Sequence, residues 1–247
     1  VGAGTGTVAF GWKGGIGTSS RRLPASLCGW TVGALVQANF GGVLQVAGAP
    51  VGRELDRYAF QNAVAANTDG PRGLADDRGD GSIIIVIATD APLSDRNLGR
   101  VASRAMMALG RTGSSASNGS GDYALAFSTA DSVRRPFDAK RLATEELANE
   151  QMTALFQAGV DAIEEAVYNS MLMATTETGN GVTVEAIPLA SVREAPRPHG
   201  RVVPDPAAAD CSVTPRPFRS PCAVGPFPCG GDNPAAACAH RRRPPPA

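Results

Sequence analysis

The sequence predicts an α+β fold, in which strands and helices share one apolar core. Residues 83–88 form an unbroken aliphatic run between turn formers, which is typical of a strand buried on both faces. A second run rich in strand formers spans residues 30–39. Two longer segments repeat apolar residues at helical spacing, about 94–113 and 144–175. With 43% hydrophobic residues, the chain has enough apolar surface to bury a core.

The N-terminal segment is rich in glycine. Residues 7–12 alternate in apolar character and predict a strand that leads into a glycine-rich turn. A Walker phosphate loop is excluded, because Lys13 precedes the glycines, whereas such a loop needs its lysine after them. We expect the glycines to allow close packing of the backbone instead.

Two polar residues stand at the ends of predicted strands. The strand at 30–39 ends at Asn39, just before a turn signal. Residues 67–81 are almost all Gly, Asp, Arg, Pro and Ala, which predicts an exposed segment. Ser82 follows directly and opens a central strand, against solvent or a cleft. On local pattern alone, Asn39 is explained as a turn former and Ser82 as the end of a loop.

The C-terminal half of the folded part continues this mixture. Ser94 is a helix N-cap, and Gly113 stops the helix that follows. Residues 114–122 are small hydroxyl, Gly and Asx residues, which predict a shaped turn that presents backbone N–H groups. The remaining predicted elements are a strand at 123–128, a helix at about 144–175 and a short strand at 182–188.

Residues 196–247 differ sharply from the rest. They hold most of the 19 prolines, four of the five cysteines and both histidines. Such a Pro-, Ala- and Arg-rich stretch buries too little apolar area to offset its chain entropy, so we expect it to be disordered. It reads like a GC-rich gene translated in the wrong frame, and a small disulfide knot is the alternative.

The composition excludes several classes of function. The formal net charge is +0, which gives no electrostatic reason to expect nucleic acid or a membrane surface as a partner. No apolar run approaches the roughly 18 residues that cross a bilayer. The folded part, up to about Ala195, contains no histidine, since His199 and His240 lie beyond it. Ser-His-Asp and Cys-His machinery is therefore excluded there, and we expect no cofactor and no metal.

Five motifs resemble, in the right order, those of the L-aminopeptidase/D-esterase and β-peptidyl aminopeptidase family. They are residues 12–19 (WKGGIGTS), 36–41 (VQANFG), 81–92 (GSIIIVIATDAP), 111–113 (RTG) and 117–122 (SNGSGD). The resemblance covers the chain from Val1 to about Arg193. It implies a self-processing hydrolase of the N-terminal-nucleophile type, in a four-layered αββα sandwich like that of ornithine acetyltransferase.

The resemblance also implies the roles of particular residues. A precursor is expected to cut itself between Gly81 and Ser82, which frees Ser82 as the nucleophile. Its new α-amino group, with an ordinary pKa of about 7.7–8.0, serves as the base, so no histidine is needed. Asn39 matches the family's oxyanion stabiliser. Ser120 and Asp122 match its supporting hydroxyl and carboxylate, although some members have Glu at the second place.

The family pattern implies an organisation in subunits. Residues 1–81 correspond to the C-terminal part of an α-subunit and residues 82–195 to a β-subunit, together forming one domain that is incomplete at its N-terminus. We expect a small peptide or amide substrate and a homo-oligomer of such heterodimers, without nucleic acid or membrane partners. The compartment is left open.

The predicted function is a self-processing serine aminopeptidase or amidase. It would release N-terminal L-, D- or β-amino acids from short peptides, amides or esters through an acyl-enzyme on Ser82. One alternative is an acyltransferase of the ornithine acetyltransferase kind, where the nucleophile is a Thr in a different motif. The other is a non-catalytic assembly fragment, because part of the family's site precedes Val1.

Overall fold

The computed structural model describes residues 4–68 and 81–195, all of which belong to one compact unit, Val1–Cys211. A second unit, Ser212–Ala247, lies outside the described residues. The tail predicted to be disordered, 196–247, and most of the exposed segment predicted at 67–81 also fall outside them.

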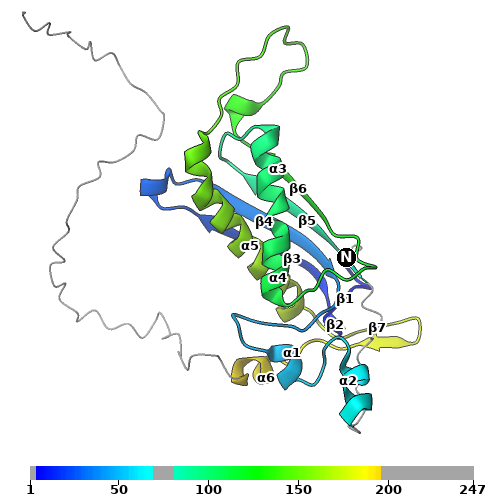
Figure 1. The fold of residues 1–247 in the computed structure, drawn as a ribbon. Coiled ribbons are helices and arrows are strands. Elements are labelled where there is room, and N and C mark those ends of the chain that lie inside the picture. Colours follow the sequence, from blue (N-terminus) through cyan, green and yellow to red (C-terminus); the bar gives the residue numbers. More distant parts are fainter. Residues whose placement is uncertain (1–3, 69–80, 196–247) are drawn as a thin grey trace, which may run out of the picture. The chain divides into compact units, whose positions relative to one another are not determined.

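The described residues form a central four-stranded sheet (Figure 1). Its strands, in spatial order, are β3 (Gly15–Arg22), β4 (Thr31–Asn39), β5 (Ser82–Thr89) and β6 (Tyr123–Ser128). The first two pairings are antiparallel, and β5 pairs with β6 in parallel. The mixed α and β content and the strands predicted at 30–39, 83–88 and 123–128 are thus confirmed.

Three helices cover one face of this sheet, α3 (Asp95–Ser103), α4 (Ala105–Thr112) and α5 (Met152–Leu172) (Figure 1). The Ser94 hydroxyl caps α3 by accepting from the Asn97 N–H at 3.4 Å, and Gly113 ends α4 in the left-handed region with φ +94°. The helix predicted at 94–113 is therefore split at Arg104. The helix predicted from about residue 144 begins later, after a 3-10 turn at Asn149–Gln151.

The glycines from residue 15 onward lie in strand β3, so the turn predicted there is wrong. The strand predicted at 7–12 is instead a hairpin that turns at Phe10 and Gly11. A Cβ placed on Gly17 of β3 would lie 1.9 Å from the Ala166 carbonyl oxygen and 2.6 Å from the Ser170 nitrogen, both in α5. Only glycine therefore lets the helix lie directly on this strand. The expectation that these glycines allow close backbone packing is confirmed.

The two faces of the sheet differ in burial. Ile83, Ile85 and Ile87 alternate toward the helices and are fully buried. The neighbouring Ile84 points to the opposite face and is 40% exposed, beside Tyr123 on β6 at 68%. Among the described residues nothing covers that face, so the prediction of burial on both faces holds for only one of them.

The remaining elements surround one end of the sheet. A short hairpin pairs β1 (Val8–Ala9) with β2 (Trp12–Lys13), and a second hairpin pairs β7 (Glu177–Gly179) with β8 (Val182–Val184), where a single strand was predicted. The short helices were not predicted: α1 (Val51–Glu54), α2 (Gln61–Thr68) and α6 (Leu189–Glu194). None of the described helices is long and apolar enough to cross a membrane.

Candidate active site

Ser82 and Asn39 face each other at one end of the central ladder. Ser82 is the first residue of β5, Asn39 is the last of β4, and the two are register partners. Directly opposed residues in an antiparallel pair lie about 4.5–5.5 Å apart at Cα and project from the same face. Both side chains are half-buried and belong to the face that the helices leave open.

The amide of Asn39 has a defined orientation. Its Oδ1 accepts a hydrogen bond of 2.9 Å from the backbone N–H of Val8 in the β1–β2 hairpin. That bond identifies the oxygen end of the amide, so Nδ2 carries its two N–H donors on the other side. Within the described part of the chain, Nδ2 has no hydrogen-bond acceptor. These two N–H groups can therefore serve a ligand.

Gly81 makes the close approach of Ser82 to Asn39 possible. Its φ is +156°, and a Cβ there would lie 2.4 Å from the Asn39 carbonyl oxygen and 2.6 Å from the Phe40 Cα. Backbone atoms cannot yield to such contacts, so a side chain at this position would push β5 away from β4. The residue before Ser82 is thus restricted to glycine by its neighbours.

The hydroxyl of Ser82 is held between two backbone groups. It donates to the Gly81 carbonyl oxygen at 2.7 Å and accepts from the Gly121 N–H at 3.1 Å. No other hydrogen bond to this hydroxyl occurs among residues 4–68 and 81–195. The Oγ therefore lies beside the peptide bond that the family pattern expects to be cut.

Ser120 and Asp122 flank Gly121, so the turn at 114–122 brings both beside Ser82. The Ser120 hydroxyl donates to Asp122 Oδ1 at 2.6 Å, and both side chains are half-buried. Neither of these two side chains makes a hydrogen bond to Ser82. In this turn the bond to Ser82 comes from the backbone N–H of Gly121. All four predicted site residues, Asn39, Ser82, Ser120 and Asp122, therefore gather at one end of the open face.

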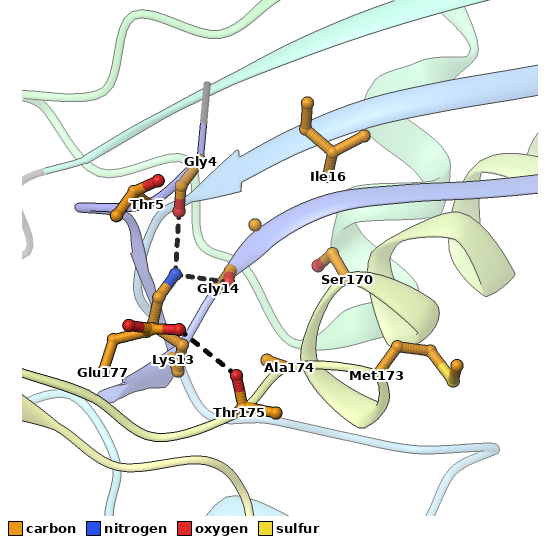
Figure 2. A pocket seen from close by; sticks show the side chains of 11 residues that line it. Gly4, Thr5, Lys13, Gly14, Ile16, Ser170, Met173, Ala174, Thr175 and Glu177 are labelled. Atoms are coloured by element: carbon orange, nitrogen blue, oxygen red, sulfur yellow. Dashed lines mark hydrogen bonds between the residues drawn. The ribbon is translucent and has the colours of Figure 1, made fainter. Parts of the chain in front are cut away.

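Lys13 lies in the wall of a cavity of about 210 Å³ (Figure 2). Its Nζ donates to the carbonyl oxygens of Gly4 at 2.8 Å, Thr7 at 3.3 Å and Gly14 at 2.8 Å. Burial lowers the pKa of this ammonium group, and the nearby Glu177 carboxylate opposes that shift. In the described ranges, no three His, Cys, Asp or Glu side chains are grouped so that they could hold a metal ion.

Sequence reasoning missed the backbone contributions. A turn presenting N–H groups was expected at 114–122, but the particular donor, Gly121, was not identified. The Val8 N–H and the buried Lys13 were not identified either. The only local signal was a lysine beside Trp12 at the end of an apolar, glycine-rich stretch, where a charged side chain is out of place.

Comparison with known proteins identifies the family. The model of "Peptidase family S58" matches residues 1–184. The chain is 44% identical over 202 residues to a protein named beta-peptidyl aminopeptidase BapA from Sphingosinicella microcystinivorans, a match that covers 78% of this chain and 50% of that protein.

Two solved structures agree with this. A Burkholderia sp. beta-aminopeptidase is 36% identical with a TM-score of 0.63, over 78% of this chain and 52% of that one. The L-aminopeptidase D-Ala-esterase/amidase from Ochrobactrum anthropi, described as a new variant among the Ntn hydrolase fold, has the same identity and TM-score over 78% and 50%. The chain spans about half the length of the relatives it matches. It belongs to peptidase family S58.

Proposed function

We propose that this chain is the catalytic part of a self-processing serine aminopeptidase or amidase, with Ser82 as its nucleophile. The observation that carries the proposal is the pairing of Ser82 with Asn39 at the end of the central ladder. A nucleophile and an amide donor on the same face are the two groups that acyl transfer requires. Relatives named beta-peptidyl aminopeptidase support a substrate with a free N-terminal amino acid.

Self-processing would begin at the Gly81–Ser82 bond. Ser82 Oγ attacks the carbonyl carbon of Gly81, its proton passes to the Ser82 nitrogen, and the C–N bond breaks to leave an ester. Water then hydrolyses that ester, which releases the Gly81 carboxylate and a Ser82 with a free α-amino group. The contact of 2.7 Å between Oγ and the Gly81 oxygen supports this route, because the attacking atom already lies beside the bond.

Turnover would use the same hydroxyl a second time. The α-amino group of Ser82, with an ordinary pKa of about 7.7–8.0, takes the hydroxyl proton directly or through water. Oγ then attacks the substrate carbonyl to form an acyl-enzyme, and the proton passes to the leaving group. Asn39 Nδ2 donates to the oxyanion, and the loss of such a donor typically costs about 10²–10³ in kcat.

Ser120 and Asp122 would support the α-amino group. The Asp122 carboxylate accepts from the Ser120 hydroxyl, which orients that hydroxyl, and its negative charge favours an ammonium group on Ser82. The pair would thereby hold the α-amino group of Ser82 in position in both its neutral and its charged form.

The open face of the sheet supports the family's four-layered αββα sandwich. Apolar side chains from three strands lie exposed on it, Leu35, Ile84, Tyr123, Leu125 and Phe127 among them. A second sheet from the rest of the complete protein would cover this face and close the site between the sheets. Residues 1–81 would then end the α-subunit and 82–195 would form the β-subunit, in a homo-oligomer of such heterodimers.

The test is mass spectrometry of the protein expressed from its full-length gene. The wild type should give two chains, one of which begins at Ser82, together with aminopeptidase activity on short β- or D-peptides. Ser82→Ala should give one chain and no activity, because one hydroxyl performs both reactions. Ser20→Ala, on the exposed edge strand β3, is the matched control and should behave like the wild type. Cleavage between residues 81 and 82 in the Ser82→Ala variant would disprove the assignment.

A further inference from the structure

The side chain of Lys13 has no part in the proposed reaction, yet it is built into the site's support. Lys13 is only 4% exposed, and a buried ammonium group is costly unless its protons are bonded. Its three bonds go to the carbonyls of Gly4, Thr7 and Gly14, and Figure 2 shows two of them. A neutral amine has only two N–H groups and would turn its lone pair toward one of those oxygens. The site therefore suits the charged form.

One of these three carbonyls belongs to the peptide group that orients Asn39. The Thr7 carbonyl and the Val8 N–H lie at opposite ends of a single planar peptide. Lys13 Nζ donates to the Thr7 oxygen at 3.3 Å, and the Val8 N–H donates to Asn39 Oδ1 at 2.9 Å. A continuous chain of hydrogen bonds thus runs from the ammonium group through one peptide to the Asn39 amide.

We infer that Lys13 is a positioning residue for the reaction, which aims and polarises the Asn39 amide through the Thr7–Val8 peptide. The inference rests on the proposed function, because it requires Asn39 to be the oxyanion donor. Lys13 itself does not touch the substrate.

Two physical effects follow from this arrangement. The first is orientation: the Val8 N–H can pair only with the oxygen of the Asn39 amide, so Nδ2 must face the reacting carbonyl. A flipped amide would present an oxygen to the oxyanion and repel it. The second is polarisation, since each bond in a chain strengthens the next by roughly 10–30%. The positive charge of the Lys13 ammonium group, beside the Thr7 oxygen, makes the Val8 N–H a stronger donor. The Asn39 Nδ2 becomes a stronger donor in turn.

The hairpin that carries Thr7 and Val8 does not depend on Lys13 alone. The Phe10 N–H donates to the Phe40 carbonyl at 2.8 Å, and the Lys13 backbone N–H donates to the backbone carbonyl of Glu185 at 2.7 Å. The Arg57 guanidinium lies 3.6 Å from the ring centre of Trp12. The Thr7 carbonyl oxygen also accepts from the Gly14 N–H at 3.1 Å. Loss of the Lys13 side chain should therefore leave the hairpin folded and remove only the charged donor from the Thr7–Val8 peptide.

The test is a double-mutant cycle in the full-length, processed enzyme. Lys13→Met keeps most of the side-chain volume and removes the charge; it should lower kcat about 10–10²-fold with KM changed by less than about threefold. In the Asn39→Ala background, Lys13→Met should cause no further loss. Lys140→Met, at the exposed second lysine, is the matched control and should leave kcat unchanged.

The outcomes separate this inference from the proposed function. Additive losses in the cycle would overturn the inference, because Lys13 would then act by direct charge or by general stability rather than through Asn39. An effect on KM alone would overturn it as well. An unchanged kcat in Asn39→Ala would instead overturn the oxyanion role of Asn39, on which the inference stands.

A second variant breaks the chain of hydrogen bonds one step further on. Val8→Pro removes the N–H that Asn39 accepts but leaves the Lys13 charge in place. It should reproduce the kcat loss of Lys13→Met, and the two together should lose no more than either alone. This variant decides the question if Lys13→Met does not fold. Wild-type kcat in Val8→Pro would overturn the inference.

Discussion

The two faces of the central sheet are built from the same strands but have opposite surroundings. On the face toward the helices the side chains are alanine or β-branched, such as Ala34, Val36 and Ile85, and Gly17 lets α5 lie directly on the backbone. On the open face the large apolar side chains are exposed by 40% or more, from Leu35 and Ile84 at 40% to Tyr123 at 68%. Successive residues of β5 point to opposite faces of the sheet, and both faces of this strand carry apolar side chains. Both faces are therefore suited to burial.

The proposed catalytic side chains all lie at the open face. Asn39 is the last residue of β4 and Ser82 is the first of β5. The residues next to them, Ala38 and Ile83, are fully buried beneath the helices. In the proposed function, the covered face therefore supports the strands and the open face carries the catalytic side chains. Covering the open face with a second sheet would exclude water from the site and strengthen its electrostatic interactions.

The largest expected effect concerns this chain expressed alone. With its open face uncovered, it should aggregate and run on a denaturing gel as one uncleaved band without aminopeptidase activity. Deleting residues 196–247 should change neither result. Leu125→Glu, which puts a charge on that face, should raise the soluble fraction several-fold, whereas Ser103→Glu, at an exposed position of α3 on the other side of the sheet, should not. Two bands, the smaller beginning at Ser82, would contradict this prediction.

A matched pair of isoleucines compares the two faces in the complete protein. Ile85→Ala, beneath the helices, should lower the free energy of unfolding by about 2–5 kcal/mol. Ile84→Ala on the open face should cost a similar amount if a second sheet covers it. Denaturant unfolding of both variants measures this directly. A cost below about 1 kcal/mol for Ile84→Ala would mean that the face stays exposed in the complete protein.

Asp122→Asn tests the polar end of the open face. The hydrogen bond from Ser120 would lose its charged acceptor, which is worth about 1–1.5 kcal/mol, so kcat should fall about tenfold without loss of stability. Asp90→Asn is the control, because Asp90 Oδ1 accepts from the Thr31 N–H at 2.7 Å at the opposite end of the sheet. Asp90→Asn should leave kcat unchanged. If Asp122→Asn unfolds the protein while the folded fraction stays fully active, the carboxylate is structural.

The smallest effect concerns the edge of the covered face, where Glu165 of α5 pairs with Ser19 and Arg21 of β3. Hydrogen bonds from Ser19 and then Arg21 hold the pKa of Glu165 below its ordinary value, and burial opposes them. Both charged side chains are about 40% exposed, 39% and 44%, so the pair should stabilise by only about 0.2–1 kcal/mol.

The sign of its pH dependence follows from the lowered pKa. The stabilisation is present above the ordinary carboxylate pKa of 4.5 and disappears as the pH falls through the lower value in the folded protein. Glu165→Gln should therefore be slightly less stable than the wild type at pH 7 and equal to it near pH 3. Thermal unfolding across this range, with the exposed Glu150→Gln as control, measures the difference. A gap that grows toward acid pH would contradict the prediction.

Local pattern predicted much of this molecule. The aliphatic run of β5, the cap at Ser94 and the stop at Gly113 are each determined by neighbours in sequence, and all three are confirmed. The motifs around Asn39 and Ser82 also pointed to residues that the fold brings together. The family match is confirmed by the family model.

The failures at the glycine-rich segment and around Asn39 share a physical cause, since each depends on residues far away along the chain. The glycines at 15 and 17 read as a turn because their extended conformation depends on the ladder with β4 and on α5, which packs on Gly17 some 150 residues later. The contact between Val8 and Asn39 joins residues 31 apart and uses a backbone N–H, which every residue except proline carries. No side-chain pattern could reveal such a donor.

The register of β4 with β5 determines how the processed protein would behave on unfolding. In each of the eight residue pairs of this ladder, the two residues lie on opposite sides of the Gly81–Ser82 bond along the chain. A cut at that bond would leave β4 within one chain and β5 at the start of the other, still joined by the central ladder. Folding would be a one-chain process before the cut and a two-chain process after it. Once denatured, the mature protein would then refold at a rate that depends on its concentration, whereas the uncut precursor would not.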